Sequence, residues 1–233
     1  MDEQARSQRP GEAQTTDDDE SIPDAHAMYA LMEDQRRVTI DAQTSFVWVM
    51  HLSWGVAWIL GYLALWSIDG SATFSLETPV AAGIFATLIG TASVISIIVG
   101  VRSGSGVKVS PASAWQSRVY GISWSAAMIA VYMLGAGLIA NGMSGTLTAV
   151  YFTSAFALAA GLMLLSTAAL FHSRSSLLLG SILLASAVVA PFAGYPGTYL
   201  VMALVGGGGY LVTGTTLVVQ ASRVRRRLRA HHA

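Results

Sequence analysis

The sequence predicts an all-α integral membrane protein, in which a bundle of six transmembrane helices follows a cytoplasmic amphipathic helix. Composition is the first observation: 53% of the 233 residues are hydrophobic and only 11% are charged, against about 25% charged residues in a typical soluble domain. Length is the second. From residue 46 to residue 219 the chain consists of apolar stretches separated by short breaks, and most of them are close to the roughly 20 residues that a helix needs to cross a bilayer.

The polar N-terminal part of the chain divides into two predicted segments. Residues 1–23, which include "TTDDDESIP", have too few apolar side chains to bury, so they are predicted to be acidic and disordered. Residues 24–45 are predicted to form an amphipathic helix on the membrane surface, with a capping box from Ser21 and Asp24. Its apolar residues recur at helical spacing: Met28, Leu31, Met32, Val38 and Ala42. A solvated helical stalk or a helix packed on a partner is the alternative interpretation.

Six transmembrane spans are predicted within residues 46–219, at 46–68, 79–101, 119–140, 146–171, 176–191 and 198–219. The fifth span is the shortest. At about 1.5 Å per residue it barely crosses the hydrocarbon, so a re-entrant or mismatched element is the alternative. The remaining residues, 220–233, form a basic tail.

The distribution of charge predicts the orientation of the chain. Arginine and lysine occur before span one, between spans two and three, between spans four and five, and after span six, whereas the opposite loops carry only Asp69 and Glu77. The positive-inside rule therefore places both termini in the cytoplasm. The excess of arginine over lysine, with abundant alanine and glycine, is typical of a bacterial genome of high GC content, so the predicted location is the cytoplasmic membrane of a bacterium.

The basic tail has a second predicted role. Five of its residues are candidate ligands for anionic lipid headgroups: Arg223, Arg225, Arg226, Arg227 and Arg229. A topology signal alone is the alternative. Nucleic-acid binding is not expected, because nothing beside the tail resembles a nucleic-acid-binding fold.

Spans one and three carry similar aromatic stripes. "HLSWGVAWILGYL" and "GISWSAAMIAVYM" match at an offset of 70 residues, a pattern consistent with a repeated helical hairpin. Spacing of four residues puts each stripe on one helical face, and eight residues are candidate guest-lining positions: Met50, Trp54, Trp58, Tyr62, Tyr120, Trp124, Met128 and Tyr132. Aromatic faces and methionines suit an apolar or cationic lipophilic guest. Bulky packing between helices is the alternative.

Span six contains a run of four glycines: Gly206, Gly207, Gly208 and Gly209. Each glycine costs roughly 1 kcal/mol of helix propensity relative to alanine, so a compensating role is expected. The run is a candidate hinge or unwound segment beside a cavity. Tight packing against a bulky neighbour is the alternative.

Span two has small residues at Ala82, Ala86 and Gly90, a spacing that permits close approach of another helix.

The residue inventory limits the chemistry. The chain has no cysteine and no carboxylate after Glu77, and it lacks a HExxH motif, so no catalytic residues, no cofactor and no enzyme activity are predicted. His51 and His172 lie near the cytoplasmic ends of spans one and four, and they are weak candidates for haem or metal ligands. Interfacial or helix-capping histidines are the alternative.

The predicted layout, with a surface helix, six spans and both ends inside, resembles the permease half of certain ATP-driven exporters. In one respect it departs from that pattern, since only "FAGYPG" separates spans five and six. The sequence therefore predicts a non-enzymatic transport component that handles an apolar guest in the lipid membrane, together with a membrane or ATPase partner subunit or further copies of itself. A membrane anchor or regulatory interaction protein without transport activity is the alternative.

Overall fold

The computed structural model describes the backbone of residues 25–104 and 110–231 and the side chains of most of these residues. The chain divides into two compact units after Thr39. In the first unit, the described residues are helical from Ala25 onward. The predicted disordered segment, 1–23, lies outside the described part, as do most side chains of the predicted amphipathic helix, 24–45; of its apolar face, Met28 is described and is exposed. The second unit, Ile40–Ala233, carries the helical bundle.

The all-α prediction is confirmed, since the described residues form helices and no strand. Their order is α1 (Ala25–Gly70), α2 (Thr78–Gly104), α3 (Pro111–Ala140), α4 (Gly145–Phe171), α5 (Arg174–Val189), the 3₁₀ turn η1 (Ala190–Ala193), α6 (Gly194–Val201), the π-helix η2 (Met202–Gly207) and α7 (Gly208–His231). Five helical stretches are long and apolar enough to cross a membrane: Val47–Gly70, Thr78–Arg102, Pro111–Ala140, Gly145–Phe171 and Arg174–Arg223. Their lengths and apolar composition indicate a membrane-embedded protein.

Serine caps set the beginnings of three helices. The Ser110, Ser144 and Ser173 side chains each accept a hydrogen bond from a backbone N–H three residues later, as N-cap residues do. The first of these caps, followed by Pro111 at the first helical position, starts α3 well before the predicted residue 119. Hydropathy alone misses this start, because "PASAWQSR" is too polar to read as membrane-spanning.

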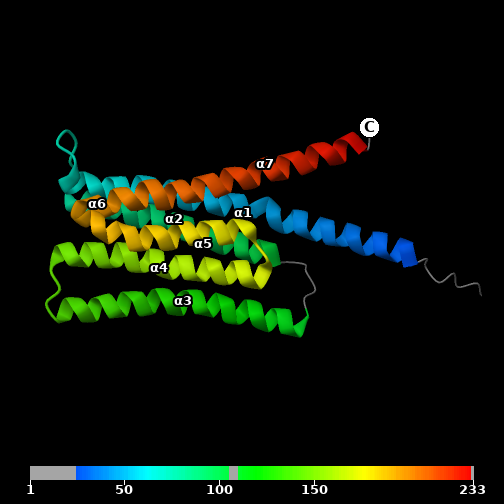
Figure 1. Cartoon of the computed structure of the whole chain (residues 1–233), viewed down its shortest axis with the longest axis horizontal. Coiled ribbons are helices and arrows are strands. Elements are labelled where there is room, and N and C mark those ends of the chain that lie inside the picture. The colour runs from blue at the N-terminus through cyan, green and yellow to red at the C-terminus, as the bar shows by residue number, and fades with distance from the viewer. Residues whose placement is uncertain (1–24, 105–109, 232–233) are drawn as a thin grey trace, which may run out of the picture. The chain divides into compact units, whose positions relative to one another are not determined.

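The last apolar stretch, Arg174–Arg223, reverses direction within its length. Gly194 has a positive φ of 63°, and Tyr195 has an extended ψ of 136°, so the helical path breaks there. Figure 1 shows α5 and α7 side by side on either side of this break. The Tyr195 hydroxyl donates a hydrogen bond to the Asp69 carboxylate at the end of α1. The turn therefore lies at the end of the bundle where α1 finishes.

The core forms where α1, α4, α5 and the segments from η1 to α7 meet. Its buried residues include Trp58, Tyr62, Leu179, Leu183 and Met202. Two glycines bring α4 and α5 together at backbone distance, since a Cβ on Gly161 would lie 3.1 Å from the Gly180 carbonyl oxygen, and one on Gly180 would lie 3.0 Å from the Gly161 oxygen. Small residues permit this approach in a bilayer.

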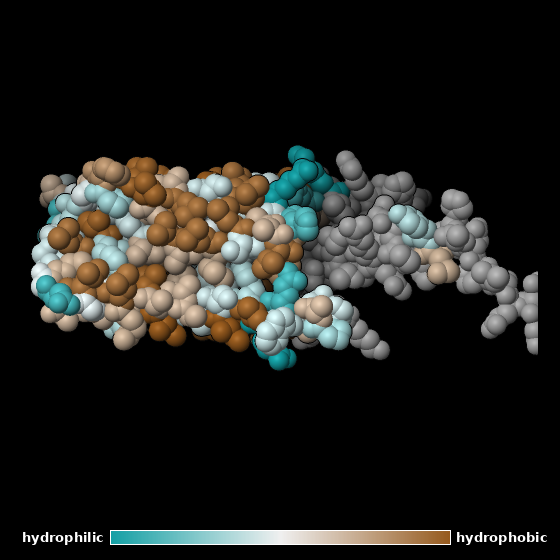
Figure 2. Space-filling model, turned by 60° about the horizontal axis from the view of Figure 1, so that its bottom comes forward, coloured by the Kyte–Doolittle hydropathy of each residue, from teal (hydrophilic) through white to brown (hydrophobic). Residues whose placement is uncertain are grey.

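Helices α2 and α3 are far less buried than the others. Only 6% of the most apolar stretch of each is buried, against 39% for α1. In Figure 2 brown apolar side chains cover much of one face of the bundle, with teal polar ones gathered toward one end. The predicted small face of α2, with Ala82, Ala86 and Gly90, is exposed, and nothing lies within 4 Å of a Cβ added at Gly90.

Replacing Gly180 with leucine is expected to lower the free energy of unfolding by about 1–3 kcal/mol, because the new side chain must push α4 away from α5. Gly90→Leu is the matched control, since nothing lies within 4 Å of its added Cβ and leucine is the better helix former. Unfolding in mixed detergent and SDS, followed by circular dichroism, compares the two variants. Equal stabilities would contradict a tight contact between α4 and α5.

Candidate functional site

The predicted aromatic stripe of α1 lies partly in the core of the bundle. Trp58 and Tyr62 are only 5% and 4% exposed. The Tyr210 ring of α7 lies 5.5 Å from the Trp58 ring, which lies 5.4 Å from Tyr62, and Tyr62 stacks on Tyr199 at 6.2 Å. Edge-to-face and stacked aromatic pairs of this kind stabilise helix packing. Trp58 and Tyr62 therefore contact other helices, which matches the packing interpretation of the stripe.

The N-terminal part of the α1 stripe, Met50 and Trp54, is less buried. Trp54 is half-buried, and its indole Nε1 donates a 2.8 Å hydrogen bond to the Ser96 hydroxyl of α2. An indole N–H in a membrane span needs such a partner. Met50 is also half-buried. Trp54 also stacks on Tyr210 of α7 at 6.3 Å, so it lies between α2 and α7, and neither Met50 nor Trp54 lines the groove described below.

The second stripe packs mainly on α4 rather than facing the first. The Tyr120 hydroxyl bonds with the Met163 carbonyl oxygen and the Thr167 hydroxyl. Trp124 and Met128 are half-buried beside the core, and Tyr132 is 59% exposed and lies against Phe152. The eight predicted guest-lining residues therefore have different surroundings, and a guest site that they share stays a prediction.

Close packing accounts for three of the four glycines in the predicted hinge. A Cβ on Gly206 would lie 2.6 Å from the Trp58 ring, one on Gly207 2.6 Å from Ile59, and one on Gly209 2.8 Å from Ile182. A Cβ on Gly208 meets nothing within 4 Å. The run also includes the end of the π-helix η2, a local departure from α-helical geometry. Hinge motion stays a prediction.

An apolar groove of about 370 Å³ lies between α1 and α2. Its α1 side consists of Trp48, Val49, Leu52, Ser53, Val56 and Ala57, and its α2 side of Leu88, Thr91, Ala92 and Ile95. The two hydroxyls are satisfied within their own helices, because Ser53 donates to the Met50 carbonyl and Thr91 to the Thr87 carbonyl. The groove therefore presents apolar surface without an unpaired hydroxyl donor.

The sequence analysis did not identify this groove, although small residues on both helices indicate it. Ser53 and Ala57 are spaced four residues apart on α1, and Thr91 and Ala92 face them from α2. Small side chains opposite one another leave a hollow between two helices that large side chains would fill. Finding it requires the pairing of α1 with α2, which a single helical pattern does not give.

The two candidate haem ligands differ in their surroundings. His51 is 2% exposed, its Nδ1 lies 2.9 Å from the Val47 carbonyl oxygen, and its Nε2 is buried without a hydrogen-bond partner. His172 is exposed and ends α4 with a positive φ of 52°, as a C-cap residue does. No cluster of three or more metal-ligating side chains occurs within the described ranges. A haem between these histidines stays a prediction.

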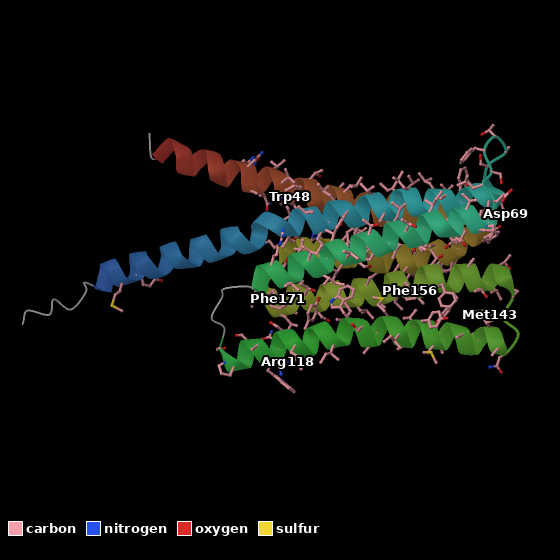
Figure 3. All side chains as sticks on the ribbon, turned by 180° about the vertical axis from the view of Figure 1, so that it is seen from behind. Trp48, Asp69, Arg118, Met143, Phe156 and Phe171 are labelled. Carbon is pink, nitrogen blue, oxygen red and sulfur yellow. The ribbon has the colours of Figure 1, made fainter. Side chains whose placement is uncertain are left out.

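Basic residues gather at one end of the bundle. Four of them are exposed: Arg102 near the end of α2, Arg118 near the start of α3, Arg174 at the start of α5 and Arg223 in the second half of α7. Figure 3 shows Arg118 and Phe171 toward this end, with Asp69 and Met143 at the other. The side chains of Arg225, Arg226, Arg227 and Arg229, predicted to bind lipid headgroups, lie outside the described part, although the helical backbone of α7 continues to His231.

No family model, curated protein or solved structure matches this chain. A helical bundle by itself does not define a function. The function is therefore inferred from the chemistry of the groove and of the arginine-rich end.

The contact between Trp58 and Gly206 predicts strong coupling between the two positions. Gly206→Ala is expected to lower the free energy of unfolding by about 1–3 kcal/mol, whereas Gly208→Ala, the control in open space, leaves it unchanged or raises it by up to about 1 kcal/mol. In a Trp58→Leu background the Gly206→Ala penalty is expected to shrink, because the ring that the new methyl meets is gone. Additive effects in this double-mutant cycle would rule out the contact.

Proposed function

We propose that the chain is a non-catalytic component of a transport assembly in the cytoplasmic membrane of a bacterium, and that it holds an apolar guest between α1 and α2. The groove is the observation that carries this proposal: ten residues line an open groove of about 370 Å³, a volume within the range of small-molecule sites. Because both hydroxyls in its walls are bonded within their helices, a guest that offers polar groups gains nothing there.

Six membrane crossings with both termini in the cytoplasm are part of the proposal. The support is twofold. First, α5 and α7 lie alongside each other on either side of the break at Gly194, so Arg174–Arg223 crosses twice rather than once. Second, exposed arginines gather at the end opposite Asp69 and Glu77, which the positive-inside rule assigns to the cytoplasm.

A partner subunit is also part of the proposal. The sequence has no carboxylate after Glu77, so the residues that ion-coupled carriers use inside the membrane are lacking there, and energy for transport would come from a separate ATPase subunit. The weakly buried α2 and α3 offer surface for that subunit or for a second copy of the chain.

A membrane anchor without transport activity is the second candidate. It is favoured by the continuation of two helices beyond their apolar spans, since α1 begins at Ala25 although its span begins at Val47, and α7 ends at His231. Identification by mass of proteins that co-purify in mild detergent separates the candidates. A co-purifying ATPase supports transport, whereas an unrelated complex, lost when residues 25–45 are deleted, supports anchoring.

The topology is testable because the chain has no cysteine. Single cysteines at Thr73, Thr146 and Phe192 are expected to react with a membrane-impermeant thiol reagent added outside intact cells. Cysteines at Ala112 and Gln220 are expected to react only after permeabilisation. If Arg174–Arg223 crossed once, Phe192 would be shielded and Gln220 would react from outside, which would refute the six-crossing arrangement.

Guest binding is testable by filling the groove. An uncharged long-chain alkyl diazirine, activated by light in the purified protein, is expected to label residues of both groove walls, and Thr91→Trp is expected to remove most of this labelling. Thr87→Trp is the matched control, because Thr87 lies one turn away, is equally exposed and does not line the groove. Uniform labelling of every exposed helix, insensitive to Thr91→Trp, would disprove a groove site.

A further inference from the structure

The register between α1 and α2 places an arginine just beyond the charged end of the groove. The backbones of these two antiparallel helices meet at Gly61, where an added Cβ would lie 3.7 Å from the Phe85 Cα. Thirteen residues further toward the arginine-rich end, α1 has Trp48 and α2 has Ile98. Because both helices rise about 1.5 Å per residue, Trp48 and Ile98 lie at the same level, and Arg102 lies about 6 Å beyond them. Trp48 lines the groove, and Arg102 is exposed.

Arg102 also lies on the groove side of α2. Leu88 and Ile95 line the groove, and Arg102 follows Ile95 by the same seven-residue step that separates Leu88 from Ile95. Seven residues are close to two full turns, so the three side chains share one face of the helix. The face of α2 that lines the groove therefore continues to a guanidinium group just beyond the charged end of the groove.

The groove has the length of one bilayer leaflet. From Trp48 to Ala57, its limits on α1, the helix rises about 14 Å, close to half of the roughly 30 Å hydrocarbon thickness. Tryptophan is enriched at the headgroup level of membranes, and Trp48 occupies the charged end. The groove thus runs from the headgroup region of the arginine-rich leaflet to the middle of the bilayer.

From these three observations we infer that the groove holds one acyl chain of an anionic phospholipid of the cytoplasmic leaflet. The acyl chain lies along Leu52, Val56 and Leu88, and the lipid phosphate pairs with the Arg102 guanidinium, which binds phosphate with charge-assisted hydrogen bonds. Trp48 packs at the level of the glycerol backbone. This inference rests on the proposed function, and it specifies the guest by charge, chain and leaflet.

The experiment uses the full-length protein in nanodiscs that contain a trace of phosphatidylglycerol with a diazirine in its acyl chain. Light-induced adducts are expected on residues 48–57 and 88–95. Unlabelled phosphatidylglycerol is expected to compete about fivefold better than phosphatidylcholine, the ratio that one basic side chain at an anionic surface supplies. Arg102→Gln is expected to abolish this preference. Arg118→Gln, at the same end but on α3, is the matched control and keeps it.

The outcomes separate this inference from the proposed function. If the uncharged alkyl diazirine labels the groove but phosphatidylglycerol and phosphatidylcholine compete equally, the lipid inference is overturned and the apolar-guest proposal stands. If neither probe labels the groove above the exposed faces of α2 and α3, both fail. Loss of the headgroup preference in Arg118→Gln as well as in Arg102→Gln would indicate a diffuse effect of the basic end and would also overturn the specific site.

Discussion

Backbone contact at glycines is the constraint on which the rest of this bundle depends. In a bilayer the lipid tails are as apolar as leucine, so helices associate through close packing rather than through the hydrophobic effect. The Gly161–Gly180 contact joins α4 to α5, and a Cβ at Gly207 of η2 would approach the Gly55 carbonyl oxygen of α1 to 3.3 Å. The first contact joins α4 with α5, and the second joins α1 with η2, within the buried part of the structure.

The close packing of α1 against η2 and α7 limits where a guest can bind. Trp58 fits against the bare backbone of Gly206, and Tyr62, Tyr199 and Tyr210 fill the space around it, so the inner face of α1 is occupied by protein. Helix α2 contacts α1 at Ser96, which accepts from Trp54, and at Phe85, which lies against Gly61. The groove lies between the same two helices where small side chains, including Ala57 and Ala92, are opposed.

The fold class and the ends of most helices could be predicted from the sequence, because the length and hydropathy of a span are local properties. The packing faces could not. Trp58 and Tyr132 are both aromatic residues of predicted stripes, yet the first is buried and the second faces outward. In a membrane both faces of a helix are apolar, so hydrophobic periodicity does not separate the core from the lipid surface. The groove could not be predicted either, because it depends on which two helices pair, and the pattern of a single helix does not give its neighbour.

An apolar groove holds an alkyl chain by its shape, but its apolar wall does not distinguish one lipophilic guest from another in a membrane. Lipid tails already surround a lipophilic molecule with equivalent apolar surface, so its transfer from bilayer to groove removes no hydrocarbon from water and gains little free energy. Selectivity must therefore come from shape and from the few polar groups at the rim. In this groove the hydroxyls of Ser53 and Thr91 are already bonded within their helices, which leaves the Trp48 and Arg102 end as the place where one guest can be distinguished from another.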